Sequence, residues 1–154
     1  MGLTEQELEE LREYLKDILQ DPVAKRMEQY MQHGTVSTYD HCRRVARASF
    51  FLNRRLHLKA DEQALAVGAM LHDLYLYDWH CHERTERLPH GFTHAAESLR
   101  NARKYFRIGL IEQEIIRTHM WPLNLTAVPT CREALIVCLA DKYCSLKETL
   151  FMRS

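Results

Sequence analysis

The chain has 154 residues, with little glycine or proline, no formal net charge and no long apolar run. Five glycines and four prolines are too few for an all-β architecture rich in turns. Basic and acidic residues balance at 21 each, so no strong field favours nucleic acid or an acidic membrane as a partner. The apolar runs are too short to span a membrane, and the acidic, amphipathic N-terminus is unlike a signal peptide. These absences predict a single globular domain in the cytoplasm.

The chain also lacks paired cysteines, because none of its five cysteines forms a CxxC pair. An odd number without a secretion signal predicts reduced thiols rather than disulfides. Four of the cysteines lie in helical patterns and are expected to be small core residues: Cys42, Cys131, Cys138 and Cys144. The pattern disfavours a structural zinc site built on thiolates.

What the chain does have is helical periodicity, which predicts an all-α fold in one domain over 1–154. Thr4 with Glu7 is a capping-box signal, and Asp21 precedes a proline at the first position of a helix. An N-terminal helical hairpin is expected over 1–34, with a core at 37–150. The expected helices span about 4–19, 22–32, 37–57, 61–73, 93–106, 110–119 and 131–150. The segments 76–90 and 121–129 are expected to be irregular.

Histidine is over-represented, with nine in the chain. Four of the predicted helices place a histidine or an aspartate on their apolar stripe: His41, the pair His72-Asp73, His119 and Asp141. Each alone could be an ordinary core residue. Together they favour metal ions, because buried unpaired polar groups are costly. Mixed nitrogen and oxygen ligands suit one or two divalent transition-metal ions (iron, manganese, nickel, cobalt or zinc) better than calcium.

The order of these residues resembles that of the HD-domain metal-dependent phosphohydrolase superfamily over about residues 37–150. The residues that carry the resemblance are His41, His72-Asp73, His94, His119 and Asp141. The histidines at 94 and 119 resemble the subset with a two-metal site. Their spacing, with Phe106-Arg107-Ile108 between them, is similar to that of small bacterial HD hydrolases that split diadenosine tetraphosphate. The fold so implied is an HD-domain helical bundle.

The resemblance implies that one ion is held by His41, His72, Asp73 and Asp141, and the other by Asp73, His94 and His119. It implies hydrolysis of a phosphomonoester, phosphodiester or phosphoanhydride bond by a metal-activated hydroxide. A small phosphorylated substrate, most simply a nucleotide, would be the partner. Asp73 would lie between the ions and orient the nucleophile. The alternatives are a non-catalytic metal or nucleotide sensor and a plain helical interaction module.

Two departures from the family pattern concern the substrate. Leu76 stands where many HD proteins carry a lysine, and the Gly-Tyr-Pro signature of cyclic dinucleotide phosphodiesterases is absent. His90 precedes His94 by one helical turn, so either could be the ligand. The spacing to His119 favours His94, which leaves His90 as a catalytic candidate that faces the substrate.

Three further residues are candidates for substrate binding. Lys142 could neutralise phosphate charge, although a solvated lysine is the simpler alternative. Trp79 and Trp121 could stack on a base, or could instead serve as lid or core packing. The sequence does not predict the oligomeric state.

Overall fold

The computed structural model describes residues 2–78 and 90–152, and the side chains of residues 90–92 lie outside the description. The elements in chain order are α1 (Glu5–Gln20), α2 (Pro22–Lys25), the 3₁₀ helix η1 (Arg26–Gln29), β1 (Met31–His33), β2 (Val36–Ser37), α3 (Thr38–Arg55), α4 (Glu62–Leu71), α5 (His90–Tyr105), α6 (Leu110–Thr118) and α7 (Arg132–Phe151). Helices dominate, so the all-α prediction is confirmed.

The first helix begins at the capping box that the sequence predicts. The Thr4 side chain accepts a hydrogen bond from the Glu7 N–H (3.2 Å), and the Glu7 carboxylate accepts one from the Thr4 N–H (2.7 Å). This capping box satisfies two backbone donors that a helix N-terminus otherwise leaves unpaired. Leu11 and Leu15 form part of the buried face of α1, which packs against α4.

The predicted helix over 22–32 is α-helical only to Lys25, continues as 3₁₀ helix to Gln29, and is wrong from Tyr30 on. After α2 and η1 the chain reverses through the β1–β2 hairpin, with Gly34 at φ 57° in the turn. Thr38 closes the hairpin, because its N–H donates to the Tyr30 carbonyl at 2.7 Å. An amphipathic helix would have left Gln32 to solvent, whereas the hairpin buries its side chain.

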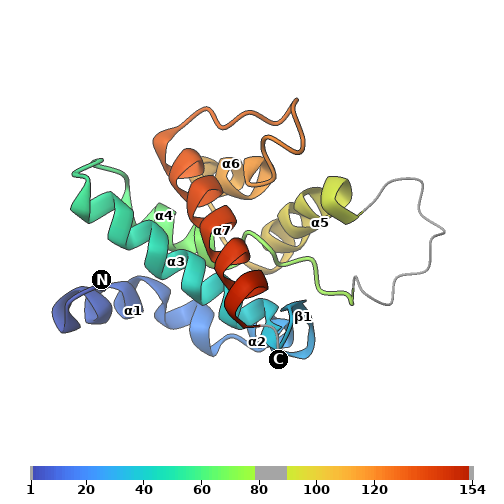
Figure 1. Cartoon of the computed structure of the whole chain (residues 1–154), viewed down its shortest axis with the longest axis horizontal. Coiled ribbons are helices and arrows are strands. Elements are labelled where there is room, and N and C mark those ends of the chain that lie inside the picture. The colour runs from blue at the N-terminus through green and yellow to red at the C-terminus, as the bar shows by residue number, and fades with distance from the viewer. Residues whose placement is uncertain (1, 79–89, 153–154) are drawn as a thin grey trace.

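The core of the molecule is built on α3 and α4, with α6 and α7 packed around them (Figure 1). Gly68 allows the close approach of α4 and α6, since a Cβ there would lie 3.0 Å from the Cβ of Ile115 and nearer still to its Cδ1. Within residues 2–78 and 90–152, no helix has both the length and the apolarity needed to cross a bilayer. The close contact matters because the C-terminal ends of α4 and α6 carry His72 and His119.

Candidate metal centre

The structure brings together six side chains from five separate segments of the sequence, and all six are buried. They are His41 on α3, His72 and Asp73 at the end of α4, His94 on α5, His119 at the end of α6, and Asp141 on α7. Five helices therefore converge on one interior point. Four imidazoles and two carboxylates buried together are stable only when cations or protons balance the carboxylate charge and pair with the lone pairs.

His72 and His119 adopt the same local arrangement. Each is the C-cap of its helix. Nδ1 of His72 lies 2.7 Å from the Ala69 carbonyl oxygen, and Nδ1 of His119 lies 2.8 Å from that of Ile116. These are backbone acceptors that a helix end leaves open, so Nδ1 is the donor. A neutral imidazole with its proton on Nδ1 keeps a lone pair on Nε2.

His41 is oriented by a carboxylate instead of a carbonyl. Its Nδ1 lies 2.8 Å from Oε2 of Glu148, a fully buried residue of α7, while its Nε2 lies 3.0 Å from Oδ1 of Asp141. Arg44 also contacts Glu148, at 3.4 Å. A carboxylate behind a histidine is the arrangement that fixes and strengthens metal-ligating imidazoles. Glu148 thus aims the His41 Nε2 into the cluster.

A first set of atoms has the spacing of neighbouring ligands around one ion. The Nε2 atom of His72 lies 3.4 Å from Oδ2 of Asp73 and 3.6 Å from Oδ1 of Asp141. The Nε2 atom of His41 lies 3.0 Å from Asp141 and 3.8 Å from Asp73. Metal–ligand bonds of about 2.1 Å put neighbouring ligands about 3.0–3.4 Å apart, so these four side chains could hold one ion.

A second set lies on the other side of Asp73. The Nε2 atoms of His94 and His119 are 2.9 Å apart, and each is 3.2 Å from Oδ1 of Asp73. The first set contacts Oδ2 of the same carboxylate and the second set contacts Oδ1. Asp73 therefore lies between two groups of potential ligands.

Two atoms of the cluster show that a cation fits it. Among the described residues, Nε2 of His72 and Oδ1 of Asp73 are buried without a hydrogen-bond partner. Such orphaned groups are rare in proteins and call for an explanation. When His72 is neutral with its proton on Nδ1, both atoms offer lone pairs and cannot satisfy one another. A divalent metal ion accepts lone pairs from nitrogen and oxygen alike, and the donor set fits it.

In the absence of an ion, protons supply the positive charge. Burial lowers the pKa of His41, but hydrogen bonds to Asp141 and Glu148 outweigh it and raise that pKa to about 10. Burial also opposes ionisation of His72 and Asp73. Their mutual attraction prevails, raising the pKa of His72 and lowering that of Asp73 well below its usual range. Metal binding must therefore displace protons.

A model of the HD domain family matches residues 38–146, which include all six clustered residues. The chain belongs to the HD domain family. Members of this family are generally metal-dependent phosphohydrolases, and their domains bind divalent metals. The family resemblance drawn from the sequence is confirmed at this level. Neither the curated proteins nor the solved structures contain a match.

Sequence reasoning missed two residues that support the HD cluster, and both lie outside the matched range. Glu148 is the first, and its place seven residues after Asp141 on the same helix was a usable signal. Gln32 is the second: its Nε2 donates to Oδ2 of Asp73 at 2.8 Å. No sequence signal marked Gln32, because an isolated amide is typical of a surface residue.

Gln32 is itself held in a buried network. The Tyr75 hydroxyl donates to its Oε1 atom, and the Thr38 hydroxyl lies 3.0 Å from the Tyr75 oxygen. The other hairpin residue at the cluster is His33, which is half-buried with its ring centroid 5.8 Å from that of His41. The hairpin that follows α2 and η1 thus forms one wall of the HD metal centre.

The remaining predicted site residues are placed only in part. The Lys142 ammonium donates to the His119 carbonyl at 2.9 Å and lies 3.3 Å from the Cys138 sulfur, so it supports the end of α6. Trp121 is half-buried two residues after His119. Trp79 and the side chain of His90 lie outside the described residues. Their roles in substrate binding or catalysis stay predictions.

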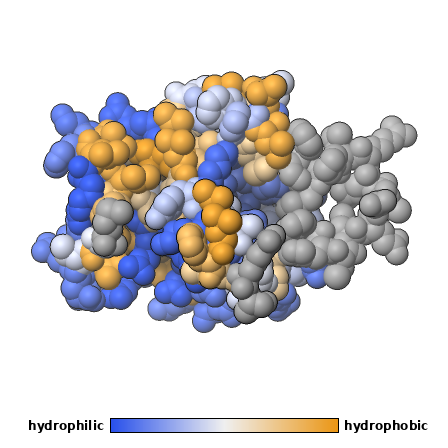
Figure 2. Space-filling view, in the orientation of Figure 1, coloured by the Kyte–Doolittle hydropathy of each residue, from blue (hydrophilic) through white to orange (hydrophobic). Residues whose placement is uncertain are grey.

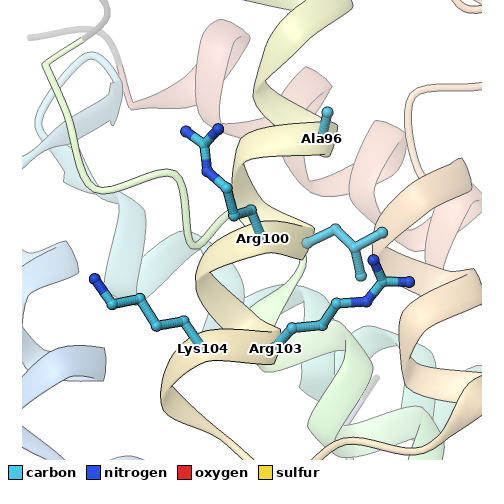
Figure 3. A pocket seen from close by; sticks show the side chains of 5 residues that line it. Ala96, Arg100, Arg103 and Lys104 are labelled. Carbon is cyan, nitrogen blue, oxygen red and sulfur yellow. The ribbon is translucent and has the colours of Figure 1, made fainter.

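A basic pocket on α5 is separate from the cluster (Figure 3). Its lining includes Arg100, Arg103 and Lys104 and none of the six clustered residues. Arg100 pairs with Glu97, and Arg103 donates to Gln113 at 2.8 Å. Ion pairs and hydrogen bonds of this kind are typical of a solvated helix face, so the pocket is not part of the metal centre.

Proposed function

We propose that this chain is a phosphohydrolase that uses one or two divalent transition-metal ions to cleave a phosphomonoester, phosphodiester or phosphoanhydride bond of a small nucleotide. The observation that carries the proposal is the pair of ligand sets that share Asp73. The facing nitrogen and oxygen atoms are 3.0–3.8 Å apart in the first set and 2.9–3.2 Å apart in the second, close to the spacing of ligands in a coordination shell.

Under this proposal His41, His72, Asp73 and Asp141 hold the first ion, and Asp73, His94 and His119 hold the second. The absence of thiolate from the cluster favours iron, manganese, nickel, cobalt or zinc in a catalytic site rather than structural zinc. Ions of this kind, when bound, activate water near neutral pH and offset negative charge on a phosphoryl oxygen.

The side chains of the chain do the positioning. Glu148 keeps the Nδ1 proton of His41 in place, so that Nε2 faces the site. Gln32 fixes the carboxylate of Asp73, which would orient the attacking water by accepting its hydrogen bond. Burial of the cluster lowers the local dielectric and strengthens both interactions.

The nucleotide part of the proposal rests on resemblance. The order and spacing of the ligands are similar to those of the small bacterial HD hydrolases of diadenosine tetraphosphate. Trp79 and Trp121 would stack on the base, Lys142 would contact a phosphate, and His90 would face the substrate. Under this proposal the enzyme would act in the cytoplasm on a soluble substrate.

The test is a hydrolysis screen with protein loaded separately with manganese, iron, cobalt, nickel or zinc. Substrates should include a phosphomonoester, a phosphodiester, nucleoside triphosphates and a dinucleoside polyphosphate. His72→Ala and His119→Ala should each lower turnover by at least about 100-fold, since each removes a ligand. His57→Asn, at an exposed histidine after α3, is the matched control and should keep wild-type turnover. Metal-loaded protein that cleaves none of these esters would contradict the proposal and favour a sensor.

A further inference from the structure

Helix α7 exposes an apolar stripe on the side opposite the metal centre. Its exposed apolar side chains retain between 43% and 76% of their accessible surface: Leu135, Leu139, Tyr143, Leu146, Leu150 and Phe151. The first five follow spacings of four, four, three and four residues, which keeps them within about 80° on the helix surface. The opposite side of α7 packs against α3, α4 and α6.

A helix with apolar residues on two opposite sides normally buries both sides. Figure 2 shows hydrophobic surface along the face of α7 that points toward the viewer. From their exposed fractions, the six side chains offer roughly 600 Å² of surface, which is the lower end of the range per partner in a stable protein interface. This area is large enough for a specific contact and larger than scattered surface leucines explain.

We infer that the exposed face of α7 is the interface between two copies of this chain, which pair antiparallel across a two-fold axis near Tyr143. A straight stripe along one helix is complementary to itself under such a rotation. The formal net charge of the chain is zero, so two copies do not repel one another at long range.

The charges beside the stripe set the direction of pairing. The exposed charged residues of α7 are Arg132 and Lys147, both basic, and the Lys147 ammonium lies 5.7 Å from the Tyr143 ring centroid. A parallel pair would bring each basic residue against its own copy. An antiparallel pair centred on Tyr143 separates the two Lys147 positions by about 12 Å along the axis, beyond the Debye length of about 8 Å in physiological salt.

The first test is the mass of the 154-residue protein by sedimentation velocity between micromolar and hundred-micromolar concentration. The expected mass is twice the 18.2 kDa of one chain. The double variant Leu139→Lys/Leu146→Lys should weaken the dimer by at least about 100-fold, because each places a positive charge in the stripe and position 139 of one copy lies level with Lys147 of the other. Leu110→Lys is the matched control: this leucine is 83% exposed at the start of α6 and should leave the dimer intact. Circular dichroism should show the same helix content in all variants.

A second test reports the direction of pairing. Tyr143→Cys should form a disulfide between two copies under mild oxidation. Leu135→Cys should not, since antiparallel pairing places its two copies about 24 Å apart along the axis. Wild-type protein, with Cys138 and Cys144 buried, is the background control. A wild-type mass of one chain at every concentration, a double variant that stays dimeric, or crosslinking of Leu135→Cys but not of Tyr143→Cys would overturn the inference.

Discussion

Replacement of Gln32 by leucine isolates a single contact that supports the metal centre. The Gln32 amide donates to Oδ2 of Asp73 at 2.8 Å, and both side chains are buried. Leucine has a similar volume but cannot donate, so the Asp73 oxygen loses this bond. The Tyr75 hydroxyl also loses its acceptor on Gln32 but keeps Thr38, 3.0 Å away.

The expected cost is that of one buried hydrogen bond to a charged acceptor, about 1.5–3 kcal/mol in the free energy of unfolding. For a domain of this size each kcal/mol shifts the melting temperature by about 2–4 °C, so a decrease of about 3–12 °C is expected. Metal affinity should fall by about 10–100-fold, as it does when a group that orients a ligand is removed.

Thermal unfolding followed by circular dichroism, with and without metal, measures both effects. Gln6→Leu is the control, because the Gln6 amide is exposed on α1 and donates to the Glu10 carboxylate at 3.2 Å. Gln32→Leu protein that melts with the wild type and binds metal equally tightly would refute the role assigned to this amide.

Three further perturbations test the metal centre and its scaffold. Chelation should lower the melting temperature, by an amount equivalent to about 2.7 kcal/mol when the free metal was at 100 times its dissociation constant; an unmoved calorimetric transition would contradict an interior site. The folded-state pKa of His41, about 10, lies above the ordinary 6.5, so its contribution to ion-free stability is complete below pH 6.5 and is lost as pH rises toward 10. Metal affinity should rise over the same window because the proton is displaced, and calorimetric titrations at pH 6.5 and 8.5 that give equal affinity would exclude this linkage. Gly68→Ala should destabilise the fold by about 1–3 kcal/mol in urea unfolding, because the new methyl group would press on Ile115 between α4 and α6; an unchanged midpoint would show that the helices can separate freely.

The helices were predictable because their signals are local. Thr4 and Asp21 cap helices by bonds to residues two or three positions along the chain, as their sequence patterns indicated. The β1–β2 hairpin was not predictable in this way. The helical pattern was extended to Gln32, whereas the hairpin that begins at Met31 is held by tertiary contacts of Thr38 with Tyr30 and of Gln32 with Asp73.

The cluster itself could be predicted as a set of residues, because each breaks the apolar stripe of a separate helix. The sequence could not give the orientation of each imidazole. That depends on where the Ala69 and Ile116 carbonyls and the Glu148 carboxylate lie in the folded chain. Gln32 was missed for the same reason, since only the fold brings its amide to Asp73.

The cluster around Asp73 is proposed to hold divalent metal ions. Titration of ion-free protein with cobalt, followed by visible absorption and by the metal count per chain after dialysis, tests it most directly. We expect saturation at one or two ions per chain with a spectrum of nitrogen and oxygen ligands, and loss of most binding in Asp73→Ala, since Asp73 contacts both ligand sets. Wild-type protein that shows no saturable binding, or Asp73→Ala protein that binds as the wild type does, would contradict the account.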